Sequence, residues 1–204
     1  MPGYTYQKWR EPDGTRKRLY KGKKPGDPDA LTEEGRAKYA RALALDRDIS
    51  RKAAREIAAT IRGWPLQDAI EYLEAVRRKE VHVPYRVHTK QITHKPGKVL
   101  KGLVTGEVHR IPSSPGRYPQ NAAKEFLRAL RYAEAYAEER ELNTDFLRLV
   151  HVSGNLGPTH MSWMPRAHGR ATQKARHRIN IEVVVREDTE LERRIQDREA
   201  NREE

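Results

Sequence analysis

Residues 146–181 contain no Asp or Glu, in a chain in which 34% of the residues are charged. The stretch opens with FLRLVHVS (146–153), which is typical of a β-strand, and ends in the alternating aliphatic residues of a second strand, 179–185. Ordinary hairpin connections take about two to five residues, whereas this one takes 24. Ordering such a connection costs on the order of 1–2 kcal/mol per residue in backbone entropy. The sequence therefore predicts a long protruding hairpin that depends on an outside partner.

The charges on this hairpin indicate what that partner is. Because 146–181 lacks carboxylates, we expect its cations to have no intramolecular partner, and RNA phosphates would supply the missing charge. The whole chain has 41 Lys and Arg against 29 Asp and Glu, a net charge of +12, which also favours a polyanion. The residues expected to neutralise phosphates are Arg166, Arg170, Lys174, Arg176 and Arg178.

All eight histidines lie in the hairpin or in the segment 82–118, which is also basic and has Glu107 as its one acid. Imidazole rings stack on bases and hydrogen-bond to phosphates. We therefore expect the two segments to form one extended RNA surface and to meet in space. Trp163 and Tyr118 have two open interpretations, packing in the protein or stacking on a base.

Metal binding and catalysis are the alternative uses of these histidines. The hairpin histidines have neither H-x-H nor H-E-x-x-H spacing, and the chain has no Cys, so we expect no metal and no cofactor. Cleavage of RNA needs a positioned acid–base pair, and Glu107 has no identifiable partner. We expect a non-enzymatic protein, with an RNA-processing enzyme or a free RNA chaperone as alternatives. RNA turnover that is lost in His151→Ala or His168→Ala would favour the enzyme.

Apolar stripes predict three helices in the rest of the chain. They start near Ser50 as N-cap, at Pro65, and at about Pro119. Pieces of 81–118 are expected to pair as strands, and a short helix capped by Thr32 is expected to run to about Leu45. Residues 1–47 form a basic arm in this interpretation, 48–187 the body and 188–204 a charged tail, helical or disordered. With no signal peptide, transmembrane run or Cys, the simplest compartment is the cytoplasm.

The motif MPRAHGRA (164–171), followed by HRINIEVVV (177–185), resembles the large-ribosomal-subunit protein twenty-two family, universal L twenty-two. Members of that family carry Pro-Arg-Ala, a variable position, Gly-Arg and a basic stretch that leads into an alternating aliphatic strand. The predicted helices SRKAAREIAATIRG (50–63) and YPQNAAKEFLRALRYAEAYAEE (118–139) are similar to the family as well. VPYR (83–86) and GRYP (116–119) resemble its archaeal and eukaryotic branch. The resemblance covers 48–187.

This resemblance implies an α+β fold, with three helices packed on a small antiparallel sheet and a long extended β-hairpin, 146–185. It implies a structural protein of the cytoplasmic large ribosomal subunit, which binds large-subunit (23S-type) rRNA and bridges several rRNA domains. The hairpin would line the nascent-peptide exit tunnel, so the partners are rRNA, neighbouring large-subunit proteins and the nascent polypeptide, with no membrane. The candidate RNA-binding residues are Arg86, His88, Lys90, Arg117, Arg148, His160, Arg166, His168, Gly169, Arg170, Lys174, Arg176, His177 and Arg178.

Overall fold

The computed structural model describes residues 8–10, 16–18, 39–102 and 105–203. None of the helices in these residues is both long and apolar enough to span a bilayer. The elements, in chain order, are β1 (Lys8–Arg10), β2 (Arg16–Arg18), β3 (Tyr39–Arg47), α2 (Arg51–Ile61), α3 (Leu66–Arg77), β4 (Val83–Pro84), β5 (His94–Lys95), β6 (Lys98–Lys101), β7 (Val108–Ile111), β8 (Ser114–Arg117), α4 (Gln120–Glu138), the 3₁₀ turn η1 (Thr144–Phe146), β9 (Leu147–Pro165), β10 (Ala171–Glu187) and α5 (Thr189–Glu203).

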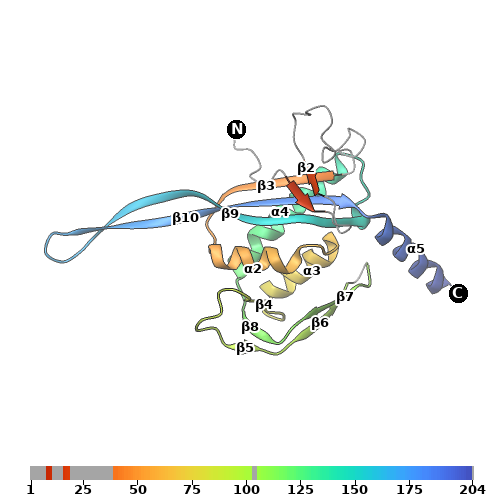
Figure 1. Ribbon diagram of the computed structural model, residues 1–204, viewed down its shortest axis with the longest axis horizontal. Helices are drawn as coiled ribbons and strands as arrows, with labels where there is room; N and C mark the ends of the chain where they lie inside the picture. Colours follow the sequence, from red (N-terminus) through yellow and green to blue (C-terminus); the bar gives the residue numbers. More distant parts are fainter. Residues whose placement is uncertain (1–7, 11–15, 19–38, 103–104, 204) are drawn as a thin grey trace.

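An antiparallel sheet in the order β3-β10-β9 forms the centre of the body. Helix α2 packs against β9, and α4 packs against β3 and β10. The aliphatic residues of β10 are buried between the sheet and these helices, with Ile179, Ile181 and Val183 at 0% exposure. Beyond the body, β9 and β10 continue together as a long two-stranded ribbon (Figure 1). The expected α+β fold with an extended hairpin is confirmed.

The three predicted helices are confirmed as α2, α3 and α4, and their apolar stripes supply most of the core. Phe126, Leu130 and Ala133 of α4 all have 0% exposure, as the period of three to four residues requires. Ser50 is the residue before α2, as predicted. However, its side chain makes no capping hydrogen bond, so it contributes the position of the N-cap without the bond.

The segment 82–118, called the middle segment from here on, forms strands, as its lack of helical periodicity predicted. One small sheet has the order β4-β8-β5, and β6 pairs with β7. Both lie on the side of α2 and α3 away from the β3-β10-β9 sheet (Figure 1). Helices α2 and α3 therefore separate the middle segment from the part of the hairpin that lies in the body (Figure 1).

The expected short helix that ends near Leu45 is wrong for its described part, because residues 39–47 form strand β3 at the edge of the central sheet. Alternate residues Ala40, Ala42 and Ala44 are buried against the core. Ala and Leu favour helices intrinsically, but pairing with β10 overrides that preference. The body therefore begins earlier than residue 48. Residues 32–38 of the expected helix lie outside the described residues, as does most of the predicted basic arm.

The tail is helical from Thr189 to Glu203, one of the two states predicted for it. Leu191 and Ile195 are buried, so the first turns of α5 pack on the protein. The boundary expected at residue 188 is therefore not a structural one.

Candidate nucleic-acid interface

The outer part of the hairpin is a ribbon whose residues 158–177 are all exposed. Its last cross-strand pair is Pro165 with Ala171, and the Arg166 amide donates to the Arg170 carbonyl oxygen at 2.7 Å across the tip. His168 and Gly169 close the turn with φ angles of 60° and 64°, a left-handed conformation that favours glycine. The predicted loop is thus strand on both sides and a five-residue turn, 166–170.

The two faces of this ribbon differ in chemistry. Residues directly opposite one another in an antiparallel pair lie on the same face, and neighbours along a strand lie on opposite faces. Lys174 opposite Ser162 and Arg176 opposite His160 make one face cationic. Trp163 opposite Gln173 and Met161 opposite Ala175 make the other face largely uncharged and apolar.

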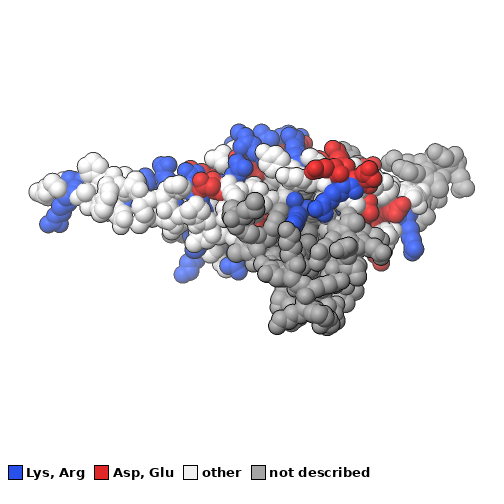
Figure 2. Space-filling model, turned by 90° about the horizontal axis from the view of Figure 1, so that it is seen from above, with Lys and Arg blue, Asp and Glu red and all other residues white. Residues whose placement is uncertain are grey.

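Eight of the predicted residues have exposed side chains or backbone on this ribbon or its tip: His160, Arg166, His168, Gly169, Arg170, Lys174, Arg176 and His177. His177 lies across from Thr159, whose Oγ1 is 3.0 Å from its Nδ1. Figure 2 shows Lys and Arg along the hairpin out to its tip, with Asp and Glu over the body and the root of the hairpin. Within the described residues, the four Arg and Lys of this set make no ion pair.

The expectation that every cation of 146–181 lacks an intramolecular partner is wrong where the hairpin passes residues 46–48 of the body. Arg178 lies 3.5 Å from an Asp48 carboxylate oxygen and 3.8 Å from one of Asp46. His160 Nε2 lies 3.4 Å from Asp46 Oδ1. The carboxylates come from residues 46–48, far away in sequence, which is why a search for acids inside the hairpin overlooked them.

Arg148 is the most strongly engaged of the predicted residues. Its guanidinium donates to Asp188 at 2.5 Å and to Glu107 at 2.8 Å, and all three side chains are at most 19% exposed. The hydrogen bonds and charges of Glu107 and Asp188 outweigh the desolvation of the guanidinium and raise the pKa of Arg148. Arg194 of α5 also reaches Glu107, at 3.1 Å. The structure therefore gives Arg148 a role in joining the middle segment, the hairpin root and α5.

The remaining predicted residues lie in the middle segment. Arg86, Lys90 and Arg117 are exposed, and His88 is half-buried. Arg117 donates to the Gln91 carbonyl oxygen at 3.5 Å. The two basic segments meet where Glu107 contacts Arg148, whereas α2 lies between the hairpin root and the loop that carries Arg86 (Figure 1).

Three of the eight histidines face the protein interior, so a general RNA-facing role for all of them is wrong. His82 and His151 are buried, and His109 stacks on Trp64 with ring centroids 4.0 Å apart. Desolvation lowers the pKa of His82, and the charges of Lys95 and Lys98 act in the same direction. The type of residue alone does not distinguish these histidines from the exposed ones.

Asp68, Thr105, Glu107 and His109 form a cluster of polar groups between α3 and β7. Asp68 is buried and its Oδ2 accepts from Thr105 Oγ1 at 2.6 Å and lies 2.7 Å from His109 Nε2. Ligand atoms of Asp68, Glu107 and His109 lie within 4.8 Å of one another. Since Glu107 already contacts two arginines, a cation placed here would face their charges. The cluster fits a structural link between α3 and β7.

The two aromatic residues with open interpretations differ in environment. Tyr118 is half-buried, with the Lys95 ammonium 5.5 Å from its ring centroid, which supports packing in the protein. Trp163 is 69% exposed on the ribbon, so packing within the protein is excluded for it. Stacking on a base remains the open use of Trp163.

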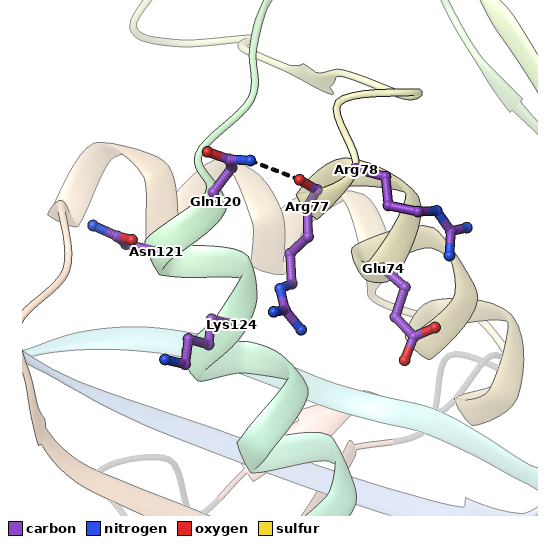
Figure 3. Close-up of a pocket in the computed structure, with 6 residues that line it drawn as sticks. All are labelled: Glu74, Arg77, Arg78, Gln120, Asn121 and Lys124. Carbon is purple, nitrogen blue, oxygen red and sulfur yellow. Dashed lines mark hydrogen bonds between the residues drawn. The ribbon is translucent and has the colours of Figure 1, made fainter.

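A shallow pocket lies where α3 ends and α4 begins (Figure 3). The Gln120 side chain donates to the Arg77 carbonyl oxygen at 2.7 Å across it. Its lining residues are Glu74, Arg77, Arg78, Gln120, Asn121 and Lys124. These six side chains supply one carboxylate, three cations and two amides, with no histidine or hydroxyl among them.

Sequence reasoning overlooked the exposed cations of α2. It used the apolar stripe of this helix, whereas the opposite face presents Arg51, Lys52 and Arg55 to solvent. The one acid of α2, Glu56, is 1% exposed. A helix whose exposed face has cations but no acid was the signal that the sequence offered.

The buried His151 makes stability depend on pH. Desolvation first, and the charge of Arg62 second, lower its pKa from 6.5 to about 4. The folded state therefore binds this proton more weakly than the unfolded state does. The contribution of neutral His151 to the free energy of unfolding is complete above pH 6.5 and is lost as the pH falls towards 4. The free energy of unfolding falls by up to about 3 kcal/mol over this interval. We expect urea unfolding of His151→Gln to be less steeply pH-dependent over this interval, whereas the exposed-site control His168→Gln should follow the wild type. Equal slopes for all three proteins would contradict this.

Comparison with known proteins places the chain in a family. The family described as "Ribosomal protein L22p/L17e" matches residues 42–186. The chain is 42% identical over 157 residues to "Large ribosomal subunit protein uL22" of Ignicoccus hospitalis, covering 77% of this chain and 93% of that protein. It is 41% identical over 150 residues to the protein of that name in Methanocaldococcus jannaschii, covering 74% and 88%, and 40% identical over 160 residues to that in Methanopyrus kandleri, covering 78% and 92%. The chain therefore belongs to the L22p/L17e family of ribosomal proteins, as its hairpin motif indicated.

Proposed function

We propose that this protein is a non-catalytic structural component of the large ribosomal subunit. In this role it binds 23S-type rRNA, bridges several rRNA domains during assembly and contacts neighbouring large-subunit proteins. Its hairpin lines the nascent-peptide exit tunnel. The family match and the names of the archaeal relatives support the assignment to the large subunit.

The observation on which the rRNA assignment rests is the outer ribbon, residues 158–177. It is exposed along its whole length and contains no carboxylate. From residue 158 to residue 165 the ribbon extends by about 25 Å, at roughly 3.3 Å per residue. A two-stranded ribbon without a core is marginal in water. Phosphates on its cationic side would stabilise it by charge-assisted hydrogen bonds and counterion release.

The two faces of the ribbon suit two kinds of RNA contact. Lys174 and Arg176 are placed for phosphates, and Trp163, with Met161 beside it along the chain, for the flat surface of an unstacked base. A ribbon inserted between RNA segments would thus contact a different segment on each side, which supports the bridging role. The tip, with His168 and Gly169, is the part farthest from the body and is our candidate for contact with the nascent polypeptide.

Co-sedimentation tests the proposal against a free RNA chaperone and an enzyme. We expect the purified protein, added to subunits depleted of it, to sediment with the large subunit and to remain there at moderate salt. A chaperone would be released by salt or would bind both subunits equally. An enzyme would convert RNA with turnover that is lost in His168→Ala. Either of these results would refute the structural assignment.

A further inference from the structure

Glu56 is a buried carboxylate that binds the backbone of a distant loop. It lies on α2 with 1% exposure. Its Oε2 accepts from the Arg86 amide at 3.0 Å, and its Oε1 accepts from the Val87 amide at 3.2 Å. Both oxygens of a desolvated anion are thus satisfied by main-chain donors. The loop after β4 is held against α2 by this carboxylate, and an Arg86 guanidinium nitrogen donates to the Ala59 carbonyl oxygen at 3.4 Å.

This use of Glu56 leaves the cations around it without a carboxylate. Arg51, Lys52 and Arg55 are exposed on α2, and Arg86 and Lys90 are exposed on the loop. None of the five makes an ion pair within the described part of the chain. Arg51 and Arg55 are one turn apart, where like charges repel each other. The arrangement is unfavourable in the isolated protein and would be relieved by an external anion.

Helix α2 also contacts the root of the hairpin. A Cβ added to Gly154 of β9 would lie 2.8 Å from the Ala54 Cβ, so the packing of the strand against the helix leaves no room for a side chain at residue 154. Asp48, just before α2, pairs with Arg178 of β10. In Figure 1, α2 lies between the hairpin and the small β4-β8-β5 sheet. Helix α2 therefore lies between the two basic segments, and its exposed face links one to the other.

We propose that Arg51, Lys52 and Arg55 of α2, with Arg86 and Lys90 of the loop, form a second phosphate-binding surface for rRNA, and that Glu56 is its positioning residue. The name α2 surface is used for these five cations. The inference rests on the proposed function and extends it: the RNA backbone contacts the body at the foot of the hairpin as well as along it. Glu56 does not touch the RNA; it fixes where the loop cations lie relative to the helix cations.

The first experiment removes charge from the α2 surface. The full-length variant Arg51→Ala/Lys52→Ala/Arg55→Ala is titrated with large-subunit rRNA at several salt concentrations. The plot of log K against log salt should become less steep by about two to three. The matched control Arg78→Ala/Arg128→Ala/Arg131→Ala removes the same charge at arginines that pair with Glu80, Glu125 and Glu74, and it should change the slope little.

This experiment separates failure of the α2 surface from failure of the proposed function. If the α2 variant behaves as the control does while removal of the hairpin cations lowers the slope, the α2 surface is refuted and rRNA binding stands. If neither variant changes the slope, both proposals fall. If the α2 variant binds rRNA normally but no longer binds vesicles of anionic phospholipid, the α2 surface recognises a membrane. The assignment of the α2 surface to rRNA is then refuted.

The second experiment tests positioning by Glu56→Gln, which makes the protein more positive by one charge. General electrostatics would strengthen RNA binding, whereas loss of one acceptor for the loop amides should weaken it several-fold. Hydrogen exchange at the Arg86 and Val87 amides should become faster, a change that net charge does not produce. The control Glu80→Gln makes the same charge change at a site with 52% exposure. Glu56→Gln binding as tightly as Glu80→Gln would overturn the positioning role, and the α2 variant tests the surface if Glu56→Gln does not fold.

Discussion

Replacing Arg166, Arg170 and Arg176 together by alanine is expected to weaken binding to large-subunit rRNA by about two orders of magnitude in dilute salt. Each phosphate contact contributes about 0.9 to the slope of log K against log salt for duplexes and about 0.7 for single strands, so the slope should fall by about two to three. All three side chains are exposed and none makes an ion pair within the described residues. Filter binding across a salt series measures both quantities.

The control variant also loses three positive charges, but from the body instead of the hairpin. Arg78→Ala/Arg128→Ala/Arg131→Ala removes three arginines that pair with carboxylates on the body. If both triple variants lower the slope equally, binding depends on net charge alone and the hairpin has no special role. Circular dichroism should show both proteins folded, because the outer ribbon contributes no residue to the core and the three control arginines are exposed.

Arg148→Ala has the largest expected effect on stability. Removal of the guanidinium leaves Glu107 and Asp188, at 19% and 13% side-chain exposure, without their shared cation. Loss of one partner from a largely desolvated ionic network such as this costs about 3 kcal/mol. We expect the urea midpoint to fall accordingly and α5 to lose hydrogen-exchange protection, because Asp188 lies at its start and Arg194 reaches the same Glu107.

Arg128→Ala is the matched control for stability, since Arg128 is 49% exposed and pairs with Glu125 one turn away. Its effect should stay within about 0.5 kcal/mol. An Arg148→Ala protein as stable as the wild type but with a lower salt slope for rRNA would instead assign Arg148 to the RNA, as the sequence alone suggested.

The features that the sequence predicted well are those with a strong local period. The apolar stripes of α2, α3 and α4 and the alternating aliphatic residues of β10 each mark a buried face. Strand β3 was missed because YARALALDR is rich in good helix formers, although Ala40, Ala42 and Ala44 alternate as an edge strand requires. Pairing with β10 decides its structure, and that partner is more than a hundred residues away.

The candidate site could be predicted in outline, but the partners of its side chains could not. Exposure of Lys174 and Arg176 follows from the long acid-free connection. The partners of Arg148 are Glu107 and Asp188, and no property of the segment 146–181 indicates them. The same applies to Glu56, whose role follows from the loop amides that it meets in space. Long-range pairings of this kind depend on topology.

The bulge at the root of the ribbon restricts how this hairpin can change in evolution. From His177 to Ile179, β10 advances two residues while β9 advances three, from Thr159 to Leu156. Beyond that point, one residue inserted into each arm would exchange the sides on which Lys174 and Trp163 project. Insertions or deletions that preserve both sides must come as two residues in each arm. The arms of homologous hairpins should therefore differ in length by even numbers of residues, except where a further bulge restores the original orientation.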